Sequence, residues 1–248
     1  MTVHLLGTGS AHAGPDRTTT MLAVEYEAHV VLVDCGGDAV QRMLACGLDP
    51  LAVDTIILTH EHPDHISGYP LLIEKLWLMG RREALNIYGP APTLEKARAV
   101  FAIFDTLHWQ GLPERRFHPV VMEPGAPVVR LGGLTISAAP VDHPVPTIGL
   151  RFTTEAGTLV YSCDTAHSEA VVALAMGADV LIHEGTGSLS GVHSSPAEAA
   201  DVAARAGVGR LVLVHAPVGA SDEDLTDARA IFDETTWGQD GGQVSVGQ

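Results

Sequence analysis

A short stretch near residue 60 concentrates side chains of the kinds that bind metal ions. In THEHPDHISG, His60, His62 and His65 stand within six positions, with Asp64 among them. A strand is predicted over Thr55–Leu58, and residues two apart in an extended segment point the same way, so His60 and His62 can share one cation. The proline between His62 and Asp64 breaks the extension and turns Asp64 and His65 toward a second point. The stretch therefore predicts two adjacent metal positions.

The segment HEHPDH resembles the HxHxDH signature of the metallo-β-lactamase superfamily. The resemblance covers essentially the whole chain and implies an α/β fold, the four-layer αβ/βα sandwich, with two mixed β-sheets and helices on the outer faces. It also implies that His60, His62 and a later histidine hold one metal ion. Asp64, His65 and a last histidine would hold the other, with an aspartate bridging the two ions.

Three later residues complete this implied set. His143 follows a predicted strand in VDHP, and His215 ends the predicted strand Leu211–Val214. In LVYSCD, strand alternation sends Asp164 and Cys163 to opposite faces, which makes Asp164 the bridging candidate and assigns Cys163 to packing. Nitrogen and oxygen donors without a thiolate suit two zinc ions, with manganese or iron as alternatives.

Other candidate residues receive structural interpretations. Asp34, at the end of a predicted strand before two glycines, is expected to orient the metal loop by hydrogen bonds rather than to bind metal. His183 is interpreted as part of a strand end, and the loop GTGS, residues 7–10, as the floor of the pocket. The histidines without ligand spacing are His4, His12, His29, His108, His118 and His167.

Three further segments resemble the tRNase Z-like branch of the superfamily. PTIGLRF is similar to its glycine-x-Arg-Phe strand, IHEGT to its HEAT segment, and HSS to its HST segment. This resemblance implies that Glu184 and His193 form a pair that assists departure of the leaving oxygen. Glyoxalase II-like enzymes carry a TPGH-type segment that this chain lacks. His65 stands where β-lactamases proper usually have arginine, and His62 where the flavo-diiron branch has glutamate.

One departure from that branch narrows the expected substrate. In tRNase Z, a long arm that grips the tRNA elbow separates the third histidine from the bridging aspartate. Here His143 and Asp164 are only 21 positions apart, which leaves room for a hairpin. The 14 basic and 30 acidic residues give a net charge of −16, which repels long polyanions. A small phosphodiester, cyclic or aryl, is therefore expected rather than long nucleic acid.

The expected activity is dinuclear metal-dependent hydrolysis, in which two cations activate a water and clamp the phosphoryl oxygens. Asp64 would also orient or deprotonate the nucleophile, and His193, held by Glu184, would donate a proton to the leaving group. Lactone, thioester or aryl sulfate hydrolysis on the same site is an alternative. A non-catalytic metal-binding scaffold is a third reading, against which the complete ligand set argues.

A frame of alternating strands and helices is predicted to position these residues. Besides the strands already named, strands are predicted at Val3–Leu6, Thr20–Glu25, Val30–Val33, Leu85–Tyr88, Val128–Arg130, Thr135–Ala138, Gly149–Thr153, Thr158–Ser162 and Val180–Ile182. Helices are predicted at Asp38–Ala45, Leu71–Met79, Thr93–Leu107, after the capping box that begins at Ser195, and at Asp222–Thr235. The tail from Gly238 is expected to fray. We expect one domain, residues 1–248, built from two αβ halves at about 1–125 and 126–248.

Composition narrows the expected location and partners. The three cysteines, Cys35, Cys46 and Cys163, form no CxxC pair, which is typical of reduced thiols in a cytoplasmic protein. No apolar run reaches the roughly 18 residues that span a bilayer, and no secretory leader is recognised, so no membrane partner is expected. The chain also has a group of large apolar and aromatic residues: Leu76, Trp77, Leu78, Phe101, Phe104 and Trp109. Most of them are expected to lie in the core, and a substrate lid or a homodimer surface is the alternative.

Overall fold

Two seven-stranded mixed sheets form the centre of the molecule. The computed structural model describes residues 1–12, 14–187 and 191–247. The first sheet contains, in spatial order, β14 (Gln243–Ser245), β1 (Thr2–Gly7), β2 (Met21–Tyr26), β3 (His29–Val33), β4 (Val53–Ile57), β5 (Leu85–Gly89) and β6 (Arg115–Pro119). The second contains β13 (Thr235–Trp237), β12 (Arg210–Val214), β11 (Val180–Glu184), β10 (Gly157–Tyr161), β9 (Ile148–Thr154), β8 (Leu134–Pro140) and β7 (Ala126–Leu131).

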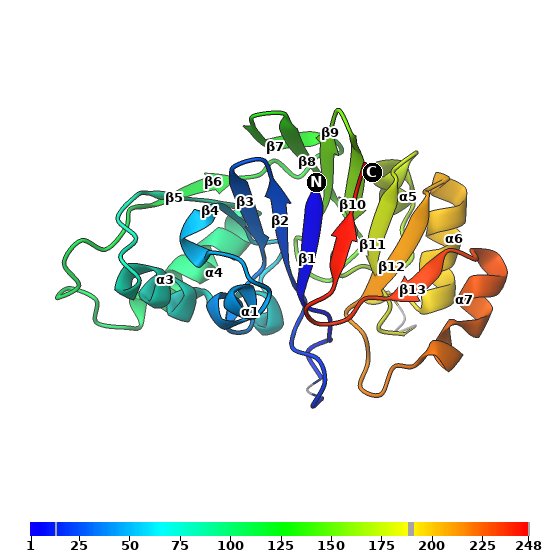
Figure 1. Ribbon diagram of the computed structural model, residues 1–248, viewed down its shortest axis with the longest axis horizontal. Helices are drawn as coiled ribbons and strands as arrows, with labels where there is room; N and C mark the ends of the chain where they lie inside the picture. The colour runs from blue at the N-terminus through cyan, green and yellow to red at the C-terminus, as the bar shows by residue number, and fades with distance from the viewer. Residues whose placement is uncertain (13, 188–190, 248) are drawn as a thin grey trace.

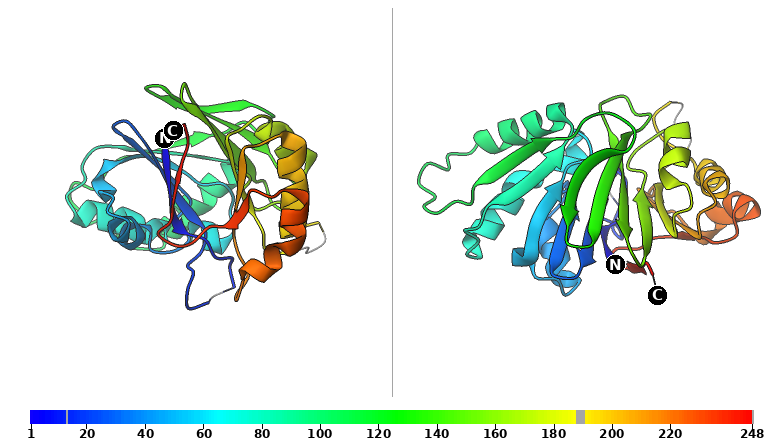
Figure 2. Two further views of the ribbon diagram at one scale, coloured as in Figure 1. Left: turned by 45° about the vertical axis from the view of Figure 1, so that its right-hand side comes forward. Right: turned by 90° about the horizontal axis from the view of Figure 1, so that it is seen from above.

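Helices cover the outer face of each sheet, as Figures 1 and 2 show. The first sheet carries α1 (Ala39–Ala45), α3 (Tyr69–Leu78) and α4 (Ala91–Ala102), with the short α2 (Pro63–Ile66) and the 3-10 turn η1 (Pro50–Ala52) in its loops. The second carries α5 (Glu169–Ala175), α6 (Pro196–Ala206) and α7 (Thr226–Ile231), the last preceded by η2 (Asp222–Leu225). The predicted four-layer αβ/βα sandwich is confirmed.

Alternation along single strands explains the layering. Leu5 and Leu6 of β1 are both buried, but Leu5 belongs to the core between the sheets and Leu6 to the core under α1 and α3. In β10, Leu159 faces the other sheet and Val160 faces the helices. Such strands are covered on both faces, which is why they are almost continuously apolar.

The central strands of both sheets run parallel, and this sets the place of the site. β3, β4, β5 and β6 are parallel to one another, as are β10, β11, β12 and β13. The loops that follow β3, β4, β10, β11 and β12 carry most of the candidate site residues. In open α/β sheets the carboxyl ends of the strands are the usual place for ligands.

Two predicted helices are too long. The helix predicted at Thr93–Leu107 ends at Ala102, because the residues beyond it have no core to pack against: Ile103 is 77% and Leu107 92% exposed. The helix predicted at Asp222–Thr235 breaks into η2 and α7, and Thr235 begins a strand instead. Here Asp224 folds back to cap Ser221 rather than continuing a regular helix.

The prediction of a frayed tail is wrong for the residues described up to 247. Strand β14 pairs with β1 and completes the edge of the first sheet, and Val244 and Val246 are buried. Asp240 accepts hydrogen bonds from the Thr8 backbone N–H and hydroxyl. Strand β6 was also missed, since its sequence, RRFHP, is polar.

The aromatic group is split between core and surface. Leu76 and Phe101 are buried in the core under α3 and α4, and Trp109 packs against it, stacked on Trp77 with ring centroids 4.8 Å apart. Leu78 and Phe104 are the exceptions to the core assignment, which was made for most of the group: Leu78 is 67% exposed and Phe104 54%.

Candidate metal centre

Six strand ends deliver the predicted site residues to one edge of the two sheets. Asp34 follows β3, the histidine-rich loop follows β4, and His143 lies three residues beyond β8. Asp164 follows β10, Glu184 ends β11 and His215 follows β12. Residues more than 150 positions apart in the sequence therefore meet at one place.

The first cluster consists of three imidazole nitrogens. His62 Nδ1 lies 3.1 Å from His60 Nε2 and 3.2 Å from His143 Nε2. Ligands bound tetrahedrally to zinc at 2.0–2.1 Å stand about 3.3 Å from one another. The three atoms are therefore spaced as the ligands of a single ion.

The second cluster combines two imidazoles with two carboxylates. His65 Nε2 is 3.6 Å from Asp64 Oδ2 and 3.4 Å from Asp164 Oδ2. His215 Nε2 is 3.3 Å and 3.2 Å from the same two oxygens. All four residues lie within reach of one ion.

Asp164 lies between the clusters. Its Oδ2 atom is 3.9 Å from His60 Nε2, besides its contacts with the second cluster. Its side chain is 2% exposed, whereas that of Asp64 is 13% exposed. This is the placement expected of a bridging ligand, with Asp64 on the more open side.

Orphaned polar atoms show that the clusters fit cations. Among the described residues, His65 Nε2 and Asp164 Oδ1 are buried without a hydrogen-bond partner. Burial lowers the pKa of His65, but the charges of Asp164 and Asp34 outweigh it and raise that pKa well above its usual value. The surroundings thus favour a positive charge at this point, which a metal ion can supply in place of a proton.

The far nitrogen of each of these rings has its own partner. His65 Nδ1 contacts Asp34 Oδ2 at 2.8 Å, and His143 Nδ1 contacts the carbonyl oxygen of Val192 at 3.1 Å. His215 Nδ1 lies 2.6 Å from the Thr186 hydroxyl. Each partner can accept the Nδ1 proton, which leaves Nε2 with a lone pair directed at the clusters. Asp34 thus has the orienting contacts expected from the sequence.

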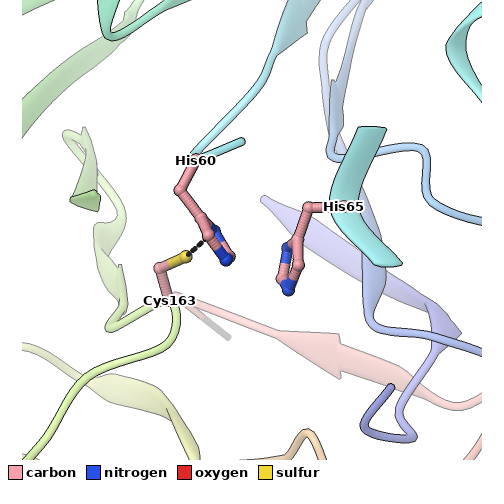
Figure 3. Close-up of side chains that lie close together, drawn as sticks. All are labelled: His60, His65 and Cys163. Carbon is pink, nitrogen blue, oxygen red and sulfur yellow. Dashed lines mark hydrogen bonds between the residues drawn. The ribbon is translucent and has the colours of Figure 1, made fainter. Parts of the chain in front are cut away.

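Cys163 is buried in the core between the sheets, as its assignment to packing predicts, but its thiol also contacts the metal loop. Strand β10 ends at Tyr161, so the alternation does not continue, and Cys163 adopts a left-handed backbone with φ of 58°. Its thiol turns toward the cluster and lies 3.5 Å from His60 Nδ1 (Figure 3). Burial raises the pKa of its thiol well above the usual value. No local sequence signal marks this contact, because a non-glycine residue after a strand gives no indication of a left-handed turn.

Glu184 and His193 form a pair beside both clusters. His193 Nδ1 lies 2.8 Å from Glu184 Oε1, and its ring centroid is 5.3 Å from that of His215 and 5.5 Å from that of His143. Burial lowers the pKa of His193, but the hydrogen bond and charge of Glu184 outweigh it and raise that pKa. Glu184 also accepts the N–H of Thr165, the neighbour of Asp164.

The segment that carries His193 is anchored by the two serines that directly follow it in the chain. The Ser194 hydroxyl donates to the Thr165 carbonyl, 2.8 Å away. The next residue, Ser195, caps α6 in the predicted capping box with Glu198. The position of His193 therefore depends on a helix start that the sequence shows plainly.

The other histidines lie outside the clusters. His4 contacts Glu25, His29 contacts Asp54, His118 contacts Asn86 and His167 contacts Asp201. His183 is buried in β11, where its Nδ1 contacts the carbonyl oxygen of Glu184 and burial lowers its pKa to about 4.

A cavity of about 330 Å³ opens next to the strand end that carries His215, although none of the seven clustered donors lines it. Its lining includes Gly9 of the GTGS loop, His12, Arg17, and Ala216, which directly follows His215. Gly9 and Ala216 form a parallel bridge, so the loop after β1 is fixed to the strand end that carries His215. The volume is at the small end of the range for ligand pockets.

Over the described part of the chain, no helix has the length and apolar character to span a membrane.

Comparisons with known proteins agree with this geometry. A family model described as a beta-lactamase superfamily domain matches residues 29–216. Ribonuclease Z of Mycobacterium bovis is 33% identical over 237 residues, covering 86% of this chain and 85% of the relative. Ribonuclease Z of Methanosarcina acetivorans is 28% identical over 297 residues, covering 96% and 95%.

Solved structures share the fold. The metallo-beta-lactamase fold protein YhfI from Bacillus subtilis has a TM-score of 0.81 at 24% identity, covering 98% of both chains. The short form of human tRNase Z has a TM-score of 0.82 at 22% identity, covering 99% of both chains.

Proposed function

This chain belongs to the metallo-β-lactamase superfamily and is related to ribonuclease Z, and from this premise we propose that it is a dinuclear hydrolase of a small phosphodiester. One observation carries the proposal. Two sets of nitrogen and oxygen donors lie side by side, with Asp164 in the second set and 3.9 Å from His60 of the first, and the Glu184–His193 pair lies beside both sets.

The seven candidate ligands would hold two divalent ions, of which zinc best suits imidazole and carboxylate donors. Their set is His60, His62 and His143 in one position and Asp64, His65 and His215 in the other, with Asp164 between them. When bound, such ions polarise phosphoryl oxygens and make water a stronger nucleophile.

Asp64 is proposed to receive the proton of the attacking water. Its carboxylate is the more exposed of the two in the second cluster, so it faces the side from which water and substrate enter. As the water oxygen bonds to phosphorus, Asp64 takes the released proton or holds the water in line for attack.

His193 is proposed to protonate the leaving oxygen. With Nδ1–H donated to Glu184, the opposite nitrogen of the charged ring can donate toward the space beside His143 and His215. Breaking the phosphorus–oxygen bond then produces an alcohol rather than an alkoxide. The buried Glu184 stabilises the charged imidazole before transfer.

The preference for a small substrate rests on the hairpin between His143 and Asp164. Strands β9 and β10 occupy this stretch and pair with each other, so no arm projects from it.

A second candidate, endonucleolytic cleavage of pre-tRNA, is favoured by the relation to proteins named ribonuclease Z. Lactone, thioester and aryl sulfate hydrolysis are further candidates for the same donors.

One substrate panel tests all of these. Protein loaded with zinc or manganese is assayed with bis-nitrophenyl phosphate, an aryl sulfate, a lactone, a thioester and a pre-tRNA. We expect turnover of the phosphodiester, its loss in Asp164→Ala, and full activity in His167→Ala, which removes a surface histidine. Preferential hydrolysis of any other ester by the metal-loaded protein would refute the assignment.

A further inference from the structure

We propose that Asp34, Thr59 and Cys163 form one buried hydrogen-bond network that fixes the proton positions of His60 and His65. These two histidines belong to different metal positions, so a single carboxylate would support both. The inference rests on the metal centre of the proposed function.

Asp34 is the acceptor on which the network ends. Its Oδ1 accepts the Thr59 backbone N–H at 2.8 Å, and its Oδ2 accepts the Thr59 hydroxyl at 2.7 Å. The Nδ1 of His65 lies 2.8 Å from the same Oδ2. A carboxylate that is fully buried needs such donors. His65 therefore carries its proton on Nδ1 and presents Nε2 to the second cluster.

Thr59 passes the same constraint to His60. A hydroxyl has one hydrogen, which Thr59 gives to Asp34, so its oxygen can only accept from its remaining neighbours. These neighbours are His60 Nδ1 at 3.2 Å and Cys163 Sγ at 2.9 Å. His60 Nδ1 can bond this oxygen only as a donor, and in that tautomer its Nε2 lone pair faces the first cluster.

Cys163 closes the network on the far side of His60. Its S–H donates to Thr59, and its sulfur lies 3.5 Å from His60 Nδ1, where it can accept a share of that proton (Figure 3). The residue adopts a φ of 58°, a conformation that favours glycine. The left-handed turn aims the Cβ–Sγ bond at the ring, which a glycine could not provide.

The two histidines depend on Asp34 by different routes. His65 contacts it directly, whereas His60 reaches it only through the Thr59 hydroxyl. Losing the hydroxyl should therefore loosen His60 more than His65, which keeps its own contact with Asp34. In Asp34→Asn, by contrast, an NH₂ group would face both the Thr59 hydroxyl and His65 Nδ1. Both histidines would lose the acceptor that sets their protons.

The test compares Thr59→Val, Thr59→Ser and Asp34→Asn with the parent protein. Zinc is titrated in competition with a chelator of known affinity, and the ring ¹⁵N resonances of His60 and His65 report each position separately. Thr59→Val should weaken the position containing His60 by about 10- to 100-fold and the other position by much less. Asp34→Asn should weaken both, and Thr59→Ser neither. The metal-free parent should show Nδ1–H on both rings.

Cys163→Ala, with Cys163→Ser as its matched control, provides an independent pair should Thr59→Val fail to fold. The alanine variant should weaken only the His60 position, by less than Thr59→Val, and the serine variant should retain more affinity. Equal weakening of both positions by Thr59→Val, or unchanged affinity and tautomer in Thr59→Val and Cys163→Ala, would overturn the network. Failure of the proposed function would look different: both ions bound normally, but no ester of the panel hydrolysed.

Discussion

Among single residues, His193 differs from the metal-site side chains because it is hydrogen-bonded to the buried carboxylate of Glu184. Nitrophenolate leaves without a proton, whereas an alkoxide such as a sugar oxygen needs one. His193→Ala should keep both metal ions and lose about 10²–10⁴ in kcat with an alkoxide leaving group. The loss with a nitrophenyl ester should be much smaller, as parallel kinetics on the two esters will measure.

The Asp64→Ala variant and the metal content of His193→Ala serve as the controls. Asp64→Ala removes a candidate ligand and should slow both esters alike, with loss of metal. Equal slowing of both esters by His193→Ala at full metal content would mean that His193 positions the phosphate without protonating anything. Metal loss in that variant would make His193 a ligand.

His183 should add a pH-dependent contribution to stability. Burial lowers its pKa from 6.5 to about 4 in the folded state, so between these values the unfolded chain binds the proton and the folded chain does not. Its contribution is therefore complete above pH 6.5 and is lost as the pH falls to 4, by about 3 kcal/mol.

Denaturant unfolding of the metal-free protein across this range would measure the effect. His183→Gln cannot titrate and should flatten the dependence, whereas His167→Gln, at a half-exposed surface position, should not. Parallel pH profiles for the parent and His183→Gln would show that His183 is not held neutral.

The sequence indicated the seven clustered donors because their types and strand-end positions are visible along the chain. It could not indicate Thr59 or Cys163 as partners of His60. Those contacts depend on a left-handed turn at Cys163 and on a neighbour 104 positions away. Such a turn follows from the packing of the two sheets and has no local signal at a non-glycine residue.

Between elements, the loop after β3 is fitted against the short helix α2. A Cβ atom added to Gly36 would lie 1.6 Å from the carbonyl oxygen of Asp64, and one added to Gly68 would lie 2.1 Å from that of Gly37. The two loops therefore meet backbone to backbone. This close approach lets Asp34 reach His65 from a neighbouring strand end.

Gly36→Ala should disturb the metal loop more than the fold. The added methyl group must displace the backbone at Asp64, and we expect loss of zinc from the second position with far-ultraviolet circular dichroism unchanged. Metal analysis after dialysis measures it. Retention of two ions per chain in Gly36→Ala would show that the loop after β3 can move without cost to the site.

Strand β14 lies in the C-terminal segment that was expected to fray, yet it contributes to the core. Val244 is buried between the sheets while its neighbour Gln243 is exposed. Val244→Asp should destabilise the protein by about 2–4 kcal/mol, because it buries an unpaired charge, and Gln243→Asp should have little effect. Equal urea midpoints for the two variants would restore the view of a frayed tail.

Elements with long apolar patterns were predictable, whereas the short helix α5, although Ser168 caps it, and the short strands β6, β13 and β14 were not predicted. The capping box of α6 fixed its start at Ser195, and the continuous apolar runs of β10 and β12 marked buried strands. β14 contributes only Val244 of its three residues to the core, too short a pattern to distinguish from a loop. Several residues after Ala102 are apolar, as a continued helix would need, but no core lies against them, and Ile103 and Leu107 are exposed.

For the whole molecule, the negative net charge should repel long polyanionic substrates more strongly than small ones. The net charge is −16, and two divalent ions would offset only four of these charges. Acidic side chains also border the site: Glu223, Asp224 and Asp227 line a pocket together with Thr186, the hydrogen-bond partner of His215. A polyanion approaching this edge would meet repulsion, whereas a small diester carries a single negative charge.

This difference predicts opposite responses to salt. Raising the salt concentration from about 0.05 to 0.5 M screens repulsion between the enzyme and a long RNA, so any residual cleavage of pre-tRNA should rise. Proteins that grip nucleic acid with basic residues lose affinity instead. Hydrolysis of a small diester should change little over the same range and should exceed pre-tRNA cleavage throughout. Steady-state kcat/KM for both substrates at several salt concentrations measures this. Efficient, site-specific pre-tRNA cleavage that weakens as salt increases would place the substrate preference with RNA.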